Sequence, residues 1–559
     1  MIPSCPEEKL RVWAPDDSTK AVAREFNCSL FTASLLAMRG VGADDMASVG
    51  AKHWMRPELG RWMEKVDLGA DSAAAARIWS TVSEASSIVV YGDYDVDGIA
   101  ATTFMLELAM LRKARVRYYI PHRYNQGYGF HHGVVKTIAE SGCRCDLIVV
   151  VDCGTQNIEA AQTAKKYGIP LIIFDHHLAR GELAGCDALI NPHVDGNDLA
   201  RKLCAAGVVW SWAWKNELAP QQWLKASIDL PALATVADCV PMSSPVNRAI
   251  VREGLDVMRT RPRPGFQALM RGIELENQSL DTDALSMRLI PCLNAAGRLE
   301  IADRSMKIFF PKSEIEDDVR HLIDLNRRRR DLSAKIISDV EKSALTSDYK
   351  HVMYGDDWPA GVLSSVASQV CCAHDAPIVL AAPAQPPLIR GTLRVPPGVD
   401  AEAILSSISD DLASWGGHRM AAGFSVNAER WQDVRDKLEC ILSKAERVVE
   451  KEDILRWSPS ELDLGSWKDA ERLGPFGVDN PYPKLFCSHS GDICAEPLGR
   501  KGNHVKIFVD GGELLGFTGE HLLSDGCSPS GWIYKPRVNF WRNLESLQLV
   551  LEKIVVSVA

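Results

Sequence analysis

The sequence lacks any long run of uncharged apolar residues. A membrane-spanning helix needs about 18 or more such residues in succession, so we expect no transmembrane segment. The N-terminal stretch MIPSCPEEKLRVWAPDD has no basic region followed by an apolar core, which is not typical of a signal peptide and favours a cytoplasmic protein. Apolar residues make up 46% of the chain and charged residues 24%, a balance typical of globular domains.

Paired metal-binding cysteines are also missing. The 15 cysteines are scattered along the chain, and no Cys-x-x-Cys pairs stand at the spacing of a zinc ribbon, so we expect reduced and mostly buried thiols. An excess of basic residues is absent too, since the formal net charge is −10. A nucleic-acid binder usually carries a basic face, but clustered acids elsewhere in a chain can conceal a basic groove in the total.

The pattern of elements predicts an α/β protein. The first ~80 residues have helical periodicity. From about residue 87, short apolar runs alternate with helical stretches, at residues 88–91, 115–120, 146–152 and 170–174. This alternation predicts βαβ units and a parallel sheet, and the continuous apolar runs suit strands that are covered on both faces.

A long helix and two further regions follow. Residues 313–345 predict one charged helix, in which the four arginines at 327–330 either contact a substrate backbone or form a solvated face. Residues 351–426 predict a second α/β region. The tail from about residue 488 predicts strands, with Val505, Ile507 and Val509 on one face and a turn at Gly511 and Gly512.

Acids and histidines follow the predicted strands. In an open parallel sheet, sites form outside the carboxyl ends of the strands, so these groups should converge on one edge. They are Asp93, Asp95 and Asp97 after the first strand, Asp152 after the third, Asp175, His176 and His177 after the fourth, and Asp238 after a further apolar run.

This many carboxylates cannot all stay ionised side by side without a compensating charge, which divalent cations supply. Carboxylate oxygens with imidazole nitrogens suit Mn²⁺ or Mg²⁺ better than a thiolate site would. Two such ions about 3.5–4 Å apart can clamp a phosphodiester and activate water. The alternative is that each acid is a helix N-cap or turn residue. The repetition of the pattern in one chain favours the metal site.

The motifs resemble those of the DHH phosphoesterases. The matching segments are residues 92–98 (GDYDVDG), 151–154 (VDCG), 175–177 (DHH) and 237–238 (AD). The resemblance implies a two-domain body with a cleft and a centre of two Mn²⁺ or Mg²⁺ ions. It implies that Asp95 and Asp97 bind one metal each and that Asp152 bridges them. His177 and Asp238 would complete a coordination shell.

Two more residues have roles that the resemblance leaves open. His176 would be a ligand or would contact the scissile phosphate, and Asp93 would bind a metal or orient a ligand or a water. The implied catalytic residues are Asp93, Asp95, Asp97, Asp152, His176, His177 and Asp238, and the implied metal ligands are the same residues without Asp93.

Other segments resemble the RecJ branch of this family. They are residues 119–123 with 127–129, 293–299 (LNAAGRL), 358–362 (WPAGV), 416–424 (GGHRMAAGF) and 473–481 (LGPFGVDNP). Arginines offer bidentate phosphate contacts, and glycines let backbone N–H groups approach a phosphate closely. The implied substrate-binding residues are Arg123, Asn294, Arg298, Thr392, Arg394, Gly416, Gly417 and His418.

The RecJ resemblance also implies a division of the chain. The expected parts are a helical cap (1–80), a DHH catalytic domain (81–255), a helical connector (256–345), a DHH-associated substrate-binding domain (346–450) and an OB-fold β-barrel that binds nucleic acid (451–559). OB-folds bind single strands through basic grooves and aromatic stacking. The candidates are His504, Lys506, Trp532, Tyr534, Lys535, Arg537, Phe540 and Trp541, of which Trp532 and Phe540 are expected to fill the barrel instead.

The activity implied by the resemblance is 5′→3′ exonuclease action on single-stranded DNA. Two-metal hydrolysis would release nucleoside 5′-monophosphates in DNA repair and recombination. The protein would act as a monomer, away from membranes, with a helicase and a single-strand-binding protein as partners.

Two other functions remain open at this point. One is a DHH phosphoesterase that acts on short RNA, cyclic dinucleotides or pyrophosphate, although such enzymes are shorter and lack a segment like 473–481. The other is a non-catalytic scaffold that binds single strands, although such relatives have typically lost ligands that are all present here. One departure from the RecJ pattern is Ala205-Ala206 in place of Gly-Ala, which puts only local packing in doubt.

Overall fold

The structure is a computed structural model that describes residues 2–42, 53–122, 127–275, 280–310, 315–346, 349–445, 451–499, 502–517, 529–541 and 544–556. The chain forms two compact units. The smaller unit consists of Met1–Trp62, Pro241–Arg252 and Glu450–Ala559, and the larger of Met63–Val240 and Glu253–Val449. Over the described ranges, every helix is too short or too polar to cross a membrane.

The larger unit contains the predicted parallel sheet. Its strands are β3 (Ser87–Tyr91), β4 (Arg115–Tyr119), β5 (Leu147–Val151), β6 (Leu171–Phe174) and β7 (Ala188–Ile190), in the order β4-β3-β5-β6-β7. All neighbouring pairs are parallel. β5 and β6 are buried along their whole length, as continuous apolar runs predict for strands covered on both faces.

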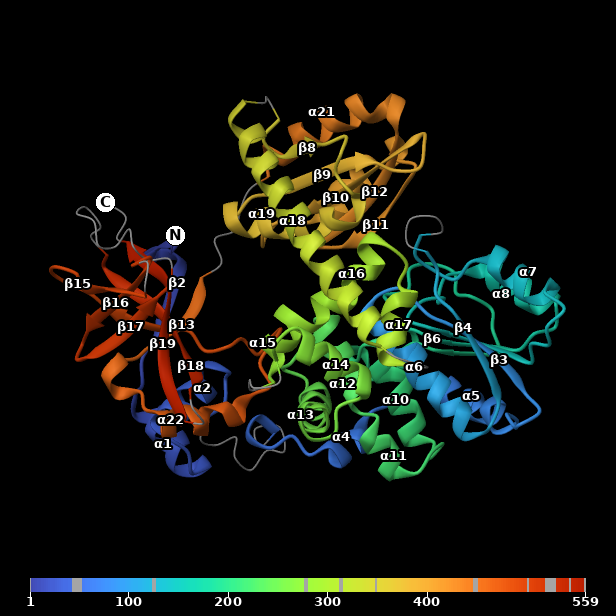
Figure 1. Ribbon diagram of the computed structural model, residues 1–559, viewed down its shortest axis with the longest axis horizontal. Coiled ribbons are helices and arrows are strands. Elements are labelled where there is room, and N and C mark those ends of the chain that lie inside the picture. Colours follow the sequence, from blue (N-terminus) through green and yellow to red (C-terminus); the bar gives the residue numbers. More distant parts are fainter. Residues whose placement is uncertain are drawn as a thin grey trace. The chain divides into compact units, whose positions relative to one another are not determined.

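Helices cover the two faces of this sheet (Figure 1). α7 (His132–Glu140) and α8 (Ile158–Lys166) pack on one face, and α6 (Val96–Leu111) and α10 (Ala205–Lys215) on the other, with α12 (Asp229–Ala237) against α6 and α10. Because neighbours surround α6, its residues are apolar on almost every side. The remaining helices here are α5 (Asp71–Ser80), α9 (Pro192–Asp195) and α11 (Gln221–Ala226).

A helical region connects this sheet to a second one. Its helices are α14 (Pro264–Gly272), α15 (Thr282–Ala284), α16 (Ile290–Leu299), α17 (Asp303–Phe309) and the predicted long helix, α18 (Glu316–Thr346). Two more helices, α4 (Leu59–Lys65) and α13 (Pro245–Thr260), contain points where the chain passes from one unit to the other.

The second sheet is mixed. Its order is β11-β12-β10-β9-β8, and only β8 and β9 are parallel. The strands are β8 (Val352–Tyr354), β9 (Ile378–Pro383), β10 (Leu388–Arg394), β11 (Ser414–His418) and β12 (Ala421–Asn427), accompanied by the helices α19 (Ala360–His374), α20 (Ala401–Ser407) and α21 (Trp431–Leu442). This confirms a second α/β region after the long helix.

The smaller unit contains a nine-stranded sheet built from both ends of the chain. Its strands are β1 (Ser4–Pro6), β2 (Leu10–Trp13), β13 (Glu452–Arg456), β14 (Leu485–Ser488), β15 (Cys494–Leu498), β16 (His504–Val509), β17 (Gly512–Gly516), β18 (Gly531–Trp541) and β19 (Leu544–Val556), and its helices are α1 (Asp17–Phe26), α2 (Leu30–Met38) and α22 (Leu464–Ala470). The sheet takes in strands beyond the expected C-terminal barrel.

The expectation of a purely helical N-terminal segment is therefore wrong. β1 pairs in parallel with β19, and β2 pairs in parallel with β13. Strands this short carry little periodicity of their own, and their partners lie more than 400 residues away along the chain. No local sequence pattern therefore predicts them.

The turn between β16 and β17 lies one residue earlier than predicted. Val509 pairs with Gly512, so the two-residue loop is Asp510-Gly511 and Gly512 already begins β17. Both loop residues have positive φ, which is the conformation that a tight hairpin turn requires. The predicted alternation in β16 is confirmed, since Val505, Ile507 and Val509 are buried.

The core of this sheet contains two of the proposed stacking aromatics. Trp532 and Tyr534 are 0% exposed and belong to the same apolar cluster as Trp467. The Tyr534 hydroxyl donates to the carbonyl oxygen of Trp457. Trp532 therefore fills the interior, as the alternative interpretation predicted, and cannot stack on a base without unpacking the core.

Replacing Trp532 with alanine should lower the free energy of unfolding of the smaller unit by about 3–5 kcal/mol, because a large side chain leaves a filled core. Phe508→Ala is the matched control, since that ring is 37% exposed on β16. Its effect should stay within about 0.5 kcal/mol. Urea unfolding followed by circular dichroism measures both. Reduced DNA affinity of the Trp532→Ala protein at unchanged stability would contradict the assignment to the core.

Candidate metal centre and substrate-binding site

Parallel pairing brings the motif residues of β5 and β6 to one edge of the sheet. Val151 is the partner of Phe174, and Phe174 is the partner of Ile190. Asp152 and Asp175, which follow these strands, therefore lie at the same level. The strand order reverses between β3 and β5, and the crevice at such a reversal is where open parallel sheets bind ligands.

Backbone N–H groups anchor the acids of the loop after β3. Asp95 is the N-cap of α6, and its Oδ1 accepts from the N–H groups of Asp97 (3.0 Å) and Gly98 (3.1 Å). The two oxygens of Asp97 accept from the N–H groups of Ala205 (2.7 Å) and Ala206 (2.8 Å) at the start of α10. Because α10 contributes only backbone N–H groups to these hydrogen bonds, the presence of Ala-Ala in place of the Gly-Ala of the RecJ pattern does not disturb them.

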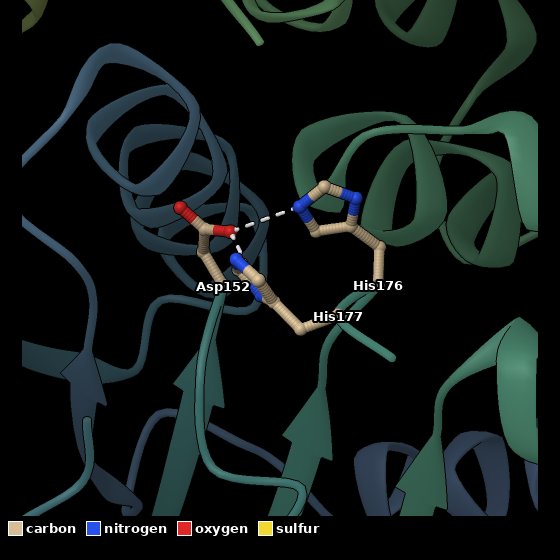
Figure 2. A group of neighbouring side chains, drawn as sticks. All are labelled: Asp152, His176 and His177. Atoms are coloured by element: carbon tan, nitrogen blue, oxygen red, sulfur yellow. Dashed lines mark ion pairs between the residues drawn. The ribbon is translucent and has the colours of Figure 1, made fainter. Parts of the chain in front are cut away.

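His176 faces three carboxylates that come from three different elements. Its Nε2 atom lies 3.4 Å from Asp152 Oδ1, 3.6 Å from Asp238 Oδ2 and 3.7 Å from Asp97 Oδ2. Nε2 is buried and makes no hydrogen bond to any residue in the described ranges. Figure 2 shows the rings of His176 and His177 directed toward Asp152 from the neighbouring strand end.

His177 is oriented by Asp175. The Nδ1–H of His177 donates to Asp175 Oδ1 over 2.8 Å, and the same oxygen accepts from the N–H groups of His176 and His177. The hydroxyl of Tyr128 lies 3.0 Å from the same Nδ1. Because Nδ1 is engaged, Nε2 is the ring nitrogen that remains for a metal or a substrate.

Asp238 comes from a helix, so the expectation that it ends a strand is wrong. It is the C-cap of α12, and it reaches the site because α12 packs on α6 and α10. The apolar run before it is buried inside the helix layer. Apolar periodicity does not distinguish a short, fully buried helix from a buried strand.

The burial of like charges raises the pKa values of the carboxyl groups. Burial and then the charge of Asp95 raise the pKa of Asp97 to about 7. Burial and the charges of Asp97 and Asp95 raise the pKa of Asp238 to about 8, and the pKa of Asp152 rises well above its ordinary value for the same reasons. Without a compensating cation, the cluster therefore tends to retain protons.

The two imidazoles shift in opposite directions. Burial and then the charge of His177 lower the pKa of His176 to about 3, so its ring is neutral and can act as a ligand. Burial alone would lower the pKa of His177 as well, but the hydrogen bond and charge of Asp175 raise it to about 9. Burial would raise the pKa of Asp175, but its hydrogen bond with His177 and the charge of His177 hold that pKa below its ordinary value.

The donors that meet at this edge fit divalent cations. Three groups have donor atoms within 4.8 Å of one another: Asp93, Asp95 and Asp152; Asp97, His176 and Asp238; and Asp152, His176 and His177. Oxygen and imidazole donors without thiolate suit Mn²⁺ or Mg²⁺. A cation would also give the buried Nε2 of His176 a partner and would offset the repulsion among the carboxylates.

The helix α16 supports the acidic loop. Asn294 Oδ1 accepts from the N–H of Val96 over 3.2 Å. A Cβ atom at Gly297 would lie 2.7 Å from the carbonyl oxygen of Tyr94, so only glycine permits this close approach. Asn294, expected at the substrate, thus contacts the loop that carries the acids.

A hollow of about 370 Å³ lies between α19 and the second sheet. Four of the predicted substrate-binding residues line it together: Thr392, Arg394, Gly416 and Gly417. Arg394 Nη1 donates to Thr392 Oγ1 over 2.9 Å. Arg390 is a second arginine in the lining, and no carboxylate is found there among the residues that the structure describes. These features suit a phosphate group.

Two other predicted residues are neighbours of residues that line this hollow. Arg298 Nη1 lies 3.4 Å from Ser364 Oγ, which lines the hollow. His418 directly follows Gly417 on β11, and burial and then the charges of His177 and Arg180 lower its pKa. Arg123 lies outside the described residues.

The C-terminal candidates that face solvent are basic. His504, Lys506 and Lys535 are partly exposed and Arg537 is exposed. Lys506 pairs with Glu513 at 2.8 Å, and Lys535 with Glu552 at 2.6 Å. Phe517, which is 44% exposed, packs edge-on against His504 and was not anticipated. The side chains of Phe540 and Trp541 lie outside the described residues.

Three family models match consecutive parts of the chain. They are the N-terminal domain of the DHH family at residues 87–236, the DHHA1 domain at 347–449 and the RecJ OB domain at 455–553. The chain belongs to the RecJ branch of the DHH family. The ranges matched by the family models agree with the two α/β regions and with most of the nine-stranded sheet described above.

RecJ proteins of several bacteria are similar to almost the whole chain. The single-stranded-DNA-specific exonuclease RecJ of Bacillus subtilis (strain 168) is 29% identical, over 97% of this chain and 70% of the relative. The RecJ protein of Escherichia coli (strain K12) is 28% identical, over 85% of this chain and 89% of the relative.

Two solved RecJ structures share the fold. RecJ from Thermus thermophilus in complex with Mn²⁺ has a TM-score of 0.81 at 23% identity, covering 99% of this chain and 80% of that one. An exonuclease RecJ bound to manganese has a TM-score of 0.57 at 27% identity, covering 67% of this chain and 95% of that one.

Sequence reasoning missed the residues that hold His177 in position. Asp175 belongs to the recognised motif but was given no role, although it holds His177. Thr155 and Asn191 are buried polar residues that were not singled out. Asn191 directly follows the apolar run of β7, and a polar residue at that position is the signal that could have identified it.

The charge cluster predicts how the metal-free protein responds to pH. Asp97, Asp238 and His177 have pKa values raised to about 7, 8 and 9, so the stability that they contribute is present at low pH and is lost as the pH rises through these values. The lowered pKa of His176 acts in the opposite direction, but only below its ordinary value of 6.5. In EDTA, the thermal midpoint should therefore fall between pH 6.5 and 9.

The variant Asp152→Asn isolates the cause, because it keeps the shape of the side chain and removes one buried ionisable carboxyl group. In EDTA at pH 8 it should unfold at a higher temperature than the wild type. Mn²⁺ should stabilise the wild type and leave the variant unchanged. Thermal unfolding with and without Mn²⁺ measures both effects, and equal stabilisation of the two proteins by Mn²⁺ would rule out a cation at this cluster.

Proposed function

We propose that this protein is a single-stranded-DNA-specific 5′→3′ exonuclease that releases nucleoside 5′-monophosphates in DNA repair and recombination. The observation that carries the proposal is the buried cluster of carboxylates and imidazoles at the sheet edge, in the same unit as an arginine-lined hollow. Membership of the RecJ branch supports the substrate and the reaction class.

The candidate ligands divide into two groups around Asp152. We assign Asp93 and Asp95 to one cation position and His176 to the other, with Asp97 and Asp238. The resemblance implied a ligand role for His177 and left His176 as either a ligand or a phosphate contact, so this proposal differs from it at His177. The reason is that Nε2 of His176 faces the carboxylates, whereas Nδ1 of His177 is engaged by Asp175.

When bound, two divalent cations would offset the charge of the scissile phosphate and lower the pKa of the attacking water. The chain itself keeps the acids in place before any substrate arrives. The start of α10 holds Asp97, and the side chain of Asn294 holds the loop at Val96. Such preorganisation lowers the cost of reorganising the site as charge develops in the transition state.

We propose that His177 contacts the scissile phosphate. Its side chain is 38% exposed, and the raised pKa favours a protonated ring. With Nδ1–H donating to Asp175, Nε2–H can donate to a non-bridging phosphate oxygen. A charge-assisted hydrogen bond of this kind is stronger than one between neutral groups.

The hollow at Thr392 and Arg394 supports the proposed direction of attack. We propose that it holds the 5′-terminal phosphate of the strand, so that the first phosphodiester meets the acid cluster. The N–H groups of adjacent strand residues point in opposite directions, so either Gly416 or Gly417 on the edge strand β11 would add a backbone donor, and the side chain of His418 would add another. The ion pair between Arg180 and Glu402 joins the loop after β6 to α20, which supports a passage too narrow for a duplex.

The other two functions have less support. Enzymes acting on dinucleotides would not need the RecJ OB domain, which matches residues 455–553 here. A non-catalytic scaffold would not need a full set of closely placed donors. We further propose that the protein acts as a monomer on single strands supplied by a helicase, beside a single-strand-binding protein, because a nuclease restricted to single strands depends on other proteins to expose them.

Degradation of end-labelled DNA tests the proposed function. With Mn²⁺ or Mg²⁺ the protein should shorten a long single strand from its 5′ end and leave a matched duplex intact, and EDTA should stop the reaction. Asp152→Asn should lower kcat at least about 1,000-fold, since the central carboxylate serves both cation positions. Cleavage of dinucleotides but not long strands would favour another DHH activity, and tight binding without turnover would favour a scaffold.

The arginine of the hollow offers a separate test of polarity. Arg394→Lys keeps the charge but loses the fork that contacts Thr392 and a phosphate together, so KM for a 5′-phosphorylated strand should rise about 10–100-fold. On a strand with a 5′-hydroxyl the same variant should differ little from the wild type. Arg419→Lys is the matched control, since its side chain is 72% exposed. An equal loss on both strands would place the 5′-phosphate elsewhere.

A further inference from the structure

Behind His177 lies a closed hydrogen-bond network that joins the ends of β5, β6 and β7. Thr155 follows β5, Asp175 follows β6 and Asn191 follows β7, and all three are at most 3% exposed. Thr155 donates to Asp175 Oδ2 through its hydroxyl (2.7 Å) and its N–H (3.1 Å). Asn191 Nδ2 donates to Thr155 Oγ1 and to the carbonyl oxygen of His177, each over 2.9 Å.

The direction of every bond in this network is determined. The single hydroxyl hydrogen of Thr155 is used on Asp175, so the Thr155 oxygen must accept from Asn191. The second hydrogen of the same amide is used on the His177 carbonyl, and Asn191 Oδ1 accepts from the N–H of His193 over 3.0 Å. Reversing the amide would break all three contacts of Asn191, so its orientation is unique.

The network fixes His177 at two points. Asn191 holds its backbone carbonyl, and Asp175 holds Nδ1 of its ring. Thr155 occupies the other oxygen of Asp175, which leaves Oδ1 for the imidazole. A ring held at its backbone and at Nδ1 can present Nε2 in only one direction.

We infer that Thr155 and Asn191 are positioning residues that aim the His177 imidazole at the scissile phosphate. The inference rests on the proposed function for the identity of that phosphate. Neither residue belongs to the three groups of candidate metal donors. They act through Asp175 and through the backbone of His177, so their loss should slow the chemical step more than it weakens the binding of cations or DNA.

The pair Thr155→Val and Thr155→Ser tests this directly. Valine keeps the shape and loses the hydroxyl, whereas serine keeps the hydroxyl. Residues that orient a catalytic group in this way typically change activity about 10–100-fold, so kcat of the valine variant should fall by that factor. KM and the Mn²⁺ affinity measured by calorimetry should stay within about threefold of the wild type, and serine should restore kcat. Asn191→Ala should behave like valine.

A double-mutant cycle with His177→Ala separates positioning from general damage. If Thr155 acts through the His177 ring, Thr155→Val should cost almost nothing further in the His177→Ala background, because the group that it aims is gone. Multiplication of the two losses, or a loss of Mn²⁺ affinity that parallels the loss of kcat, would overturn the inference.

The outcomes are distinguishable from failure of the proposed function. If the wild type does not degrade single strands, the proposed function fails. If the wild type is active and Thr155→Val retains full kcat, only the positioning role fails. Should Thr155→Val not fold, Asn191→Ala in the same cycle with His177→Ala decides the question by the same criterion.

Discussion

Electrostatic repulsion among buried carboxylates is the constraint around which the site is built. Asp93, Asp97 and Asp152 are almost fully buried at one sheet edge, and donor atoms of neighbouring acids lie within 4.8 Å of each other. Negative charges at such distances cannot persist in a protein interior without compensation. The same repulsion, together with burial, raises the pKa values of Asp97 and Asp238 to about 7 and 8.

The surrounding structure supplies only part of the compensation. Asp97 receives two backbone N–H groups from the start of α10, and Asp95 receives two from the start of α6. Asp175 is the informative contrast: equally buried, it receives donors on both oxygens from Thr155, His176 and His177, and its pKa falls. One carboxylate is thus satisfied by the fold and orients a histidine, whereas its neighbours are left for cations.

The same comparison explains why the imidazoles differ. His176 faces carboxylates whose charges the fold compensates only in part, stays neutral through burial and can act as a ligand. His177 donates a hydrogen bond to the carboxylate of Asp175, which the fold has already stabilised. The His177 ring can therefore keep a proton while remaining half exposed. Adjacent residues of the same type therefore take different roles, because their neighbours are different.

The sequence by itself determined the classes of element and the chemistry of the motif loops. Continuous apolar runs predicted β3, β5 and β6, the charged periodicity predicted α18, and the acids and histidines predicted a site for divalent cations at one sheet edge. These properties follow from local patterning, since burial on both faces demands apolar residues at every position of a strand.

Only the tertiary structure decided which histidine faces the cluster, that Asp238 ends a helix, and that Thr155 and Asn191 stand behind His177. The same holds for β1 and β2, whose partners are strands from the opposite end of the chain. Apart from the helix that ends at Asp238, each of these facts is a contact between residues distant in sequence. Such contacts depend on how elements pack and not on any local pattern, so the order of residues along the chain does not reveal them.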